Sequence, residues 1–228
     1  MRKHTFILIA ACAVLFASCG TTASFTRGEL YPKMYEEKPV TLLVMPPINN
    51  SNNVEAKDLL YTSISQPLAE AGYYVISPHL AMEIFKAESA YDAELFINNS
   101  VSQFGKVFGA DAVIFSTIDE WKKQGFGIRT KISYIVKSTR TNEVIFDRTC
   151  NLYLDLQDTN YYGGGIVGAL ANVAVSAINT ALTDHIVAAR KCNAYIFKDI
   201  PQGKYRKEYL QDRETPAEAK NVTKTVKQ

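Results

Sequence analysis

The sequence predicts an α/β domain built on a mixed sheet that is flanked by helices. In the first half of the chain, short apolar runs alternate with segments of helical spacing, which is typical of strands alternating with helices. In the second half, long alternating runs are joined by tight turns, which favours antiparallel strands. The composition agrees, because 47% hydrophobic and 21% charged residues over 228 positions are ordinary for a globular domain. A formal net charge of +2 is too small to indicate nucleic acid as a partner.

The N-terminus has the parts of a secretory signal peptide, which we place at residues 1–18. Two basic residues precede an apolar run over residues 5–16, and this run is shorter than the roughly 20 residues of a transmembrane helix. The tripeptide Phe-Ala-Ser then leads into Cys19, which resembles a bacterial lipobox, although Phe16 stands where Leu is usual. An ordinary cleaved signal with an incidental cysteine is the alternative.

The lipobox predicts that Cys19 becomes the mature N-terminus and carries a diacylglycerol and an amide-linked acyl chain such as palmitate. Several acyl chains together give a stable membrane anchor, whereas one chain alone binds only marginally. Gly20 follows, and in enteric-type bacteria the lack of Asp at that position favours the outer membrane. We therefore expect a lipid-anchored protein on the periplasmic face of the outer membrane.

Residues 19–39 are polar and mixed, and we interpret them as a tether that precedes a domain spanning residues 40–200. The apolar run Val40–Met45 predicts a buried strand. Val54–Ala71 has helical spacing interrupted near Pro67, and Gly72 is a candidate C-cap before a strand over Tyr73–Ile76.

Two further helices are expected over Leu80–Ala87 and Asn98–Phe108, the second ended by a glycine. A buried strand follows from Ala110 towards Trp121. Alternation over 128–139, a turn at 140–143 and a returning run over 144–156 then predict a hairpin. The basic residues of this hairpin are assigned to its outer face: Arg129, Lys131, Lys137 and Arg148.

The C-terminal third begins with a glycine-rich stretch and one long helix over residues 163–190. A last strand is expected over Ala194–Ile200. Residues 201–228 are polar, with an excess of basic residues, and we expect a disordered tail.

Three blocks resemble a family of bacterial lipoproteins of unknown function, the DUF799-like, genome-derived antigen type. They are VTLLVMPPINNS (residues 40–51), PLAEAGYYVISP (67–78) and FGADAVIFSTIDEW (108–121). The stretch YYGGGIVGAL (161–170) is also similar to that family. More distantly, the element order resembles the TolB N-terminal-domain fold, which is shared with curli-type (CsgG-like) lipoproteins and with activators of penicillin-binding proteins. The resemblance implies a non-catalytic role in envelope assembly or transport through protein contacts.

The remaining motifs favour structural interpretations over chemistry. Residues 163–168 fit G-x-G-x-x-G, but the acidic residue expected about 20 positions later at a strand end is missing, so we predict no dinucleotide and no other cofactor. His185 lies on an apolar helix face, and no two histidines have a metal-ligand spacing, so we predict no metal site. Asp119 and Glu120 are adjacent in a strand and point to opposite faces. With no catalytic residues to assign, we expect that the chain is not an enzyme.

Cys150 and Cys192 are the cysteines that remain after signal cleavage and acylation. An even pair in an oxidising compartment is a candidate disulfide, and two buried free thiols are the alternative.

These observations lead to the expectation of a protein-binding component of an envelope assembly or secretion complex. Its expected partners are the membrane, through the lipid at Cys19, and envelope proteins, with CsgG-like lipoproteins among the candidates. A self-assembling curli-type pore component, and hence a homo-oligomer, is an alternative because small residues dominate the helix after the glycines. A regulator of a peptidoglycan synthase is a further alternative.

Overall fold

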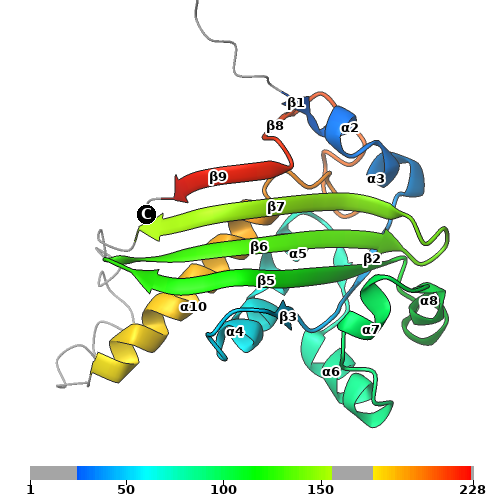
Figure 1. The fold of residues 1–228 in the computed structure, drawn as a ribbon. Helices are drawn as coiled ribbons and strands as arrows, with labels where there is room; N and C mark the ends of the chain where they lie inside the picture. Colours follow the sequence, from blue (N-terminus) through cyan, green and yellow to red (C-terminus); the bar gives the residue numbers. More distant parts are fainter. Residues whose placement is uncertain (1–24, 156–176, 227–228) are drawn as a thin grey trace, which may run out of the picture.

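The computed structural model describes residues 25–155 and 177–226. It confirms the predicted α/β fold, a mixed sheet with helices on both faces (Figure 1). In the described ranges the main sheet has seven strands in the order β4-β2-β5-β6-β7-β9, with β3 beside β5. The strands are β2 (Thr41–Val44), β3 (Ile48–Asn49), β4 (Tyr74–Val75), β5 (Ala112–Gln124), β6 (Gly127–Ser138), β7 (Val144–Asp155) and β9 (Asn221–Val226).

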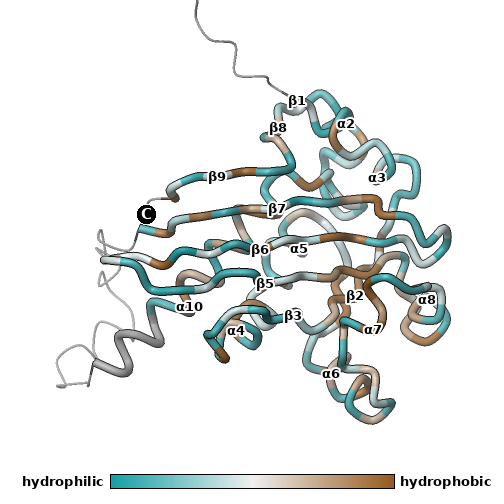
Figure 2. Tube along the Cα trace, in the orientation of Figure 1, coloured by the Kyte–Doolittle hydropathy of each residue, from teal (hydrophilic) through white to brown (hydrophobic). Residues whose placement is uncertain are grey.

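Strand direction divides this sheet as the sequence predicts. β2 lies parallel to both β4 and β5, so the first half is parallel. β5, β6 and β7 are long antiparallel neighbours joined by the predicted turns, and Gly125 adopts the positive φ of 58° that a tight turn favours. β2 is strongly hydrophobic in Figure 2 because it is buried on both faces.

One face of the sheet is covered by α4 (Ala56–Ser63), α5 (Ser65–Glu70) and α10 (Ala177–Phe197). The predicted break in the first helix is confirmed, because α4 ends before Ile64 and α5 carries Pro67, whose ring cannot continue the α4 hydrogen-bond ladder. The strand expected over 194–200 is wrong. α10 continues to Phe197 because Cys192 and Ile196, four residues apart, are both fully buried on one helix face.

The other face is covered at one end by α6 (Pro78–Ala87), α7 (Glu94–Ile97) and α8 (Ser102–Phe108). These helices pack around Phe85, whose ring centroid lies 5.3 Å from that of Phe108 and 6.2 Å from that of Phe104. α8 ends at Gly109 with φ 66°, as the glycine predicts. We call α6–α8 the helical end of the molecule.

The expected tether is wrong from residue 25 onward. β1 (Phe25–Thr26), α2 (Arg27–Leu30) and α3 (Pro32–Glu37) pack onto the domain. A capping box formed by Thr26 and Glu29 begins α2. Tyr31 is buried, with its ring 4.4 Å from Phe146 of β7, and this contact fixes the segment to the sheet.

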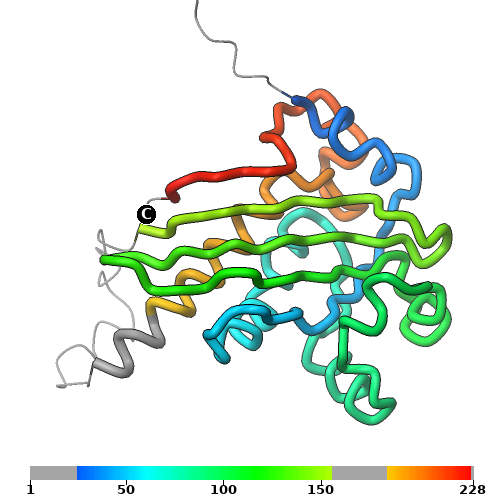
Figure 3. The backbone as a smooth tube through the Cα atoms, viewed as in Figure 1, coloured from blue at the N-terminus to red at the C-terminus, as the bar shows by residue number. Residues whose placement is uncertain are grey.

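The expected disordered tail is also wrong for residues 201–226. β8 (Pro216–Ala217) pairs with β1, and β9 lies parallel to β7 as an edge strand. Figure 3 shows this orange-to-red segment beside the blue N-terminal helices. We call β1, α2, α3 and residues 201–226 together the anchor end, because the chain enters the domain here from Cys19.

The placement of Arg148 on the outer face of the hairpin is wrong, whereas Lys137 lies on that face but is not exposed. Arg148 is fully buried beside α10, 2.7 Å from Asp199 and 3.3 Å from Glu218, and it fixes the C-terminal segment to β7. Lys137 is buried on the opposite face and donates to the carbonyl oxygens of Ile97 and Asn99. Arg129 and Lys131 do lie away from the α10 side of the sheet.

Candidate protein-binding surface

Some of the predicted site residues are not among those that the structure describes. Cys19, the predicted lipidation site, and the glycine motif at 163–168 both lie outside the described residues. The prediction of an acyl anchor on Cys19 therefore stays a prediction.

Cys150 and Cys192 are free, buried thiols in the structure, so the predicted disulfide is not formed there. Burial raises the pKa of the Cys150 thiol to about 11 and that of Cys192 to about 12. The Cys192 sulfur lies 3.2 Å from the hydroxyl of Thr130. Both side chains act as small core residues, because protonated buried thiols are poor nucleophiles.

The titratable residues singled out in the sequence serve packing and pairing. His185 is half-buried, as predicted, and its Nδ1 accepts a hydrogen bond of 2.8 Å from the indole of Trp121. Burial lowers the pKa of His185, which favours the neutral ring that this bond needs. Asp119 pairs with Lys131 at 3.3 Å, and Glu120 pairs with Lys122. Across residues 25–155 and 177–226, no group of three or more His, Cys, Asp or Glu side chains could hold a metal ion.

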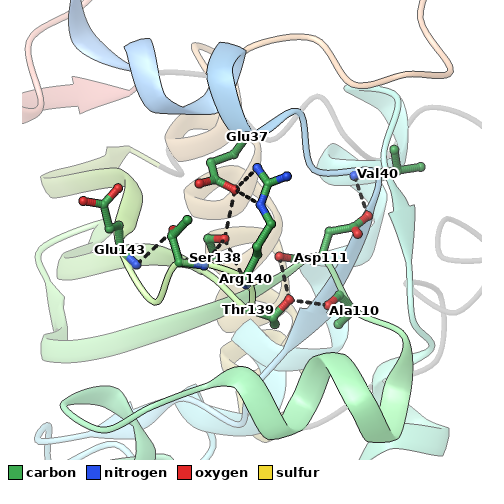
Figure 4. Close-up of polar contacts among 9 residues, drawn as sticks. Glu37, Val40, Ala110, Asp111, Ser138, Thr139, Arg140 and Glu143 are labelled. Carbon is green, nitrogen blue, oxygen red and sulfur yellow. Dashed lines mark hydrogen bonds and ion pairs between the residues drawn. The ribbon is translucent and has the colours of Figure 1, made fainter.

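A polar cluster ties the turn between β6 and β7 to the end of α3 (Figure 4). The carboxylate of Glu37 accepts hydrogen bonds from Ser138 and from the guanidinium of Arg140. Burial alone would raise the pKa of Glu37, but the hydrogen bonds from Arg140, Thr141 and Ser138 outweigh it and lower this pKa. Because every group in the cluster has a partner, we interpret it as a structural clamp.

The helical end, in contrast, exposes apolar side chains that the fold does not need. We call Leu80, Ile84, Tyr91 and Leu95 the α6–α7 patch. Leu80 is 63% exposed and lies one helical turn before Ile84, so the two side chains share one face of α6. Ala81 and Phe85, each one position later and so about 100° further around α6, are buried in the core. Exposed apolar side chains that share a face, as Leu80 and Ile84 do, indicate an interaction site.

A hollow of about 220 Å³ includes Tyr91 of this patch in its lining, whereas its α6 residues, Met82 and Lys86, lie on the other flank of the helix from Leu80 and Ile84. Its lining is apolar and is formed by Pro46, Met82 and Tyr91 together with Lys57 and Lys86. Lys86 is 3.2 Å from Glu83, and Lys57 has no ion-pair partner among the described residues. The hollow could therefore receive an apolar side chain next to a carboxylate, which is a common combination on protein surfaces.

Our sequence interpretation missed this patch, although a signal was present. Two pairs of apolar residues, 80 with 84 and 81 with 85, each have a spacing of four within one short helix. The four residues span about 140° of the helix circumference and so predict one wide apolar face, of which the fold buries only the side that carries Ala81 and Phe85.

A family model of lipoproteins matches residues 30–199 of the chain; its description reads "Putative lipoprotein GNA1162-like". The chain belongs to the GNA1162-like lipoprotein family. This confirms the family that the three sequence blocks indicate. Lipoprotein NMB1124/NMB1162 of Neisseria meningitidis serogroup B is 28% identical to this GNA1162-like chain over 169 residues, which are 72% of this chain and 77% of that protein.

Solved structures similar to this GNA1162-like protein have low sequence identity. The crystal structure of lipoprotein GNA1162 from Neisseria meningitidis is 24% identical, covers 64% of this chain and 99% of its own, and has a TM-score of 0.47. The LpoB C-terminal domain from Salmonella enterica is 16% identical, covers 54% and 93%, and has a TM-score of 0.36. The descriptions of these relatives name no catalytic activity. In the part of the chain that the structure describes, no helix is long and apolar enough to cross a membrane.

Proposed function

We propose that this lipoprotein is a non-catalytic, protein-binding component of an envelope assembly or secretion complex, anchored by acyl chains on Cys19 to the periplasmic face of the outer membrane. The α6–α7 patch is the observation that carries the proposal. α6, which carries Leu80 and Ile84, lies at the bottom of the molecule in Figure 1, whereas β1, where the described chain begins, lies at the top. An anchored molecule would therefore present this patch away from its lipid.

The chemistry of the patch describes the expected partner. Leu80 and Leu95 offer more than half of their surface to an apolar contact. The amines of Lys57 and Lys86 would attract a carboxylate at the rim of the hollow. We therefore expect an envelope protein that inserts an apolar side chain beside an acidic residue.

The test is photo-crosslinking of the full-length lipoprotein in intact cells, followed by purification in detergent. We expect a defined protein adduct with the photoreactive residue at position 95, and we expect the double substitution L80S/I84S to reduce its yield at least tenfold, since buried apolar anchors dominate interfaces. Phe126→Ser, at the exposed tip of the β5–β6 hairpin, is the matched control and should leave the yield unchanged. No adduct, or an equal loss in both variants, would contradict the proposal.

The alternative of a self-assembling pore component needs an apolar surface that can face lipid, for which the long β6–β7 hairpin is the candidate. In the structure the apolar face of this hairpin carries Ile132 and Leu152, which are fully buried in the core cluster that includes α10. The hairpin therefore has no apolar face to offer to lipid in this fold. Measuring the mass of the detergent-extracted protein tests the alternative, because a ring of subunits would be many times heavier than a monomer.

A further inference from the structure

The anchor end carries an exposed basic and aromatic surface close to where the chain enters the domain. We call it the anchor-proximal surface, and its members are Phe25, Lys204, Tyr205, Lys207, Leu210 and Arg213. Tyr205 is 67% exposed, and Leu210 is 39% exposed. Lys204 and Lys207 have no ion-pair partner among the described residues.

This surface stands on an ordered backbone, although its sequence resembles a tail. The backbone N–H of Tyr205 donates to the carbonyl oxygen of Gly72 at 3.0 Å. Gly72 has φ +91°, and a side chain there would come within 2.4 Å of Arg206, so glycine is needed for the segment to dock. At the other end, Asp212 is buried and bonded to Arg27 at 2.7 Å. The exposed side chains between these two attachments are therefore held in place.

Leu210 adds an independent observation. Its φ of +60° is in the left-handed region, which a leucine adopts only at a cost in free energy. Core packing does not offset this cost in free energy, because the leucine side chain is exposed. Backbone strain combined with an exposed apolar side chain is typical of a contact site.

The length of chain before the domain identifies what this surface contacts. With residues 25–37 packed in the fold, the predicted lipid on Cys19 is only six residues from Phe25. Six residues span at most about 20 Å even when fully extended. Arg213 lies close to the start of the domain, because its carbonyl oxygen accepts a hydrogen bond of 2.9 Å from the N–H of Gly28. The anchor end is thereby confined to the immediate neighbourhood of the bilayer.

We infer that the anchor-proximal surface binds the anionic headgroups of the membrane that holds the lipid anchor, and so fixes the orientation of the domain. Lysine and arginine side chains are attracted to anionic lipids near a bilayer surface. Tyrosine suits the headgroup layer because its ring is apolar and its hydroxyl is polar. The exposed side chains of the segment 204–214 carry a net positive charge, which suits anionic lipid. Four residues are basic, and only two exposed residues, Glu208 and Glu214, are acidic, because Asp212 is buried against Arg27. The inference rests on the predicted acylation of Cys19, which mass spectrometry of the purified protein checks separately.

The test is hydrogen exchange of the acylated, full-length mature lipoprotein reconstituted in two kinds of vesicle. In phosphatidylglycerol-containing vesicles we expect the amides of residues 203–213 to exchange about tenfold more slowly than in pure phosphatidylcholine vesicles. The double substitution K204E/K207E should abolish this slowing. K86E/K106E makes the same charge change on α6 and α8 and should retain it.

Equal exchange in the two vesicles would overturn the inference, as would an equal loss of protection in the two double variants. Persistent slowing in K204E/K207E would also overturn it, because the headgroup contact would then not depend on these amines. In each variant, unchanged hydrogen exchange in β5–β7 shows that the protein is folded. Partner crosslinking at the α6–α7 patch does not depend on these outcomes, so the two proposals can fail separately.

Discussion

The helical end and the anchor end are each stabilised by a different kind of interaction. At the helical end, the rings of Phe85, Phe104 and Phe108 pack against one another, and stability there comes from buried apolar surface. Buried ion pairs connect distant segments at and beside the anchor end: Arg27 pairs with Asp212 within it, and Arg148 of β7 pairs with Asp199, just before residue 201. Apolar packing is nearly independent of pH, whereas ion pairs respond to pH and to the loss of either partner.

This difference matches the surfaces that each end exposes. The helical end presents aliphatic side chains and a hollow, which suit a protein partner. The anchor end presents cations and tyrosine, which suit a charged interface. Because the two ends are stabilised by different chemistry, substitutions at each end should act locally.

The largest effect is expected from Arg148→Ala. It removes a buried cation from Asp199 and Glu218, and breaking such a pair costs about 3–5 kcal/mol of unfolding free energy. Denaturant unfolding measures the loss, and hydrogen exchange should show faster opening of residues 201–226 than of α6–α8. Arg129→Ala, on the other face of the same hairpin, is the control and should stay within about 0.5 kcal/mol. Equal losses in the two variants would refute the role of Arg148.

Phe85→Ala should destabilise the helical end. Truncating a fully buried phenylalanine costs about 3–5 kcal/mol, because a cavity is left between α6 and α8. Exchange should accelerate in α6–α8 before it does in residues 201–226. Leu80→Ala on the same helix is the matched control, and we expect a change within about 0.5 kcal/mol because the side chain is exposed. A costly Leu80 variant would show that this side chain packs in the monomer.

A smaller effect is expected from acid, and it should appear at the anchor end. Burial alone would raise the pKa of Glu218, but hydrogen bonds from Lys224, Tyr195 and Lys198 lower it from 4.5 to about 2. A lowered folded pKa stabilises the protein above pH 4.5, and this stabilisation is lost as the pH falls towards 2. Glu218→Gln should therefore be less stable than wild type at neutral pH, and the gap should close between these two values. A gap that stays constant with pH would contradict this.

The smallest expected signal concerns the thiols. Cys150 and Cys192 should not react with iodoacetamide in the folded protein at neutral pH, because burial raises the pKa of both. After unfolding without reductant, both should react, and mass spectrometry counts the adducts. A protein purified from the periplasm that shows no adducts after unfolding would contain the disulfide that the structure lacks.

Much of the fold could be predicted from the sequence because its signals are local. Alternation over 128–139 predicts the strand β6, and its alternate residues Ile132, Tyr134 and Val136 are fully buried. Gly72 and Gly109 were recognised as helix ends, and both have positive φ. Period and turn chemistry depend on neighbouring residues alone, so they can be read without the structure.

The errors concern interactions between residues that are distant in the chain. Residues 201–226 are polar, and their order depends on Arg148, Gly72 and Tyr73, whose hydroxyl bonds to the carbonyl oxygen of Pro201 at 2.6 Å. Nothing in local composition reveals such partners. Arg148 itself was placed on the wrong face because its charge was given more weight than its alternation with Cys150 and Leu152.

The orientation of the anchored domain is the central claim, and photo-crosslinking at two positions in intact cells tests it most directly. A photoreactive residue at position 205 is at the anchor end, and one at position 80 is in the α6–α7 patch. We predict that position 205 forms adducts with phospholipid and that position 80 forms a protein adduct, which the additional substitution Lys57→Glu weakens. Protein adducts at position 205 together with lipid adducts at position 80 would contradict the account.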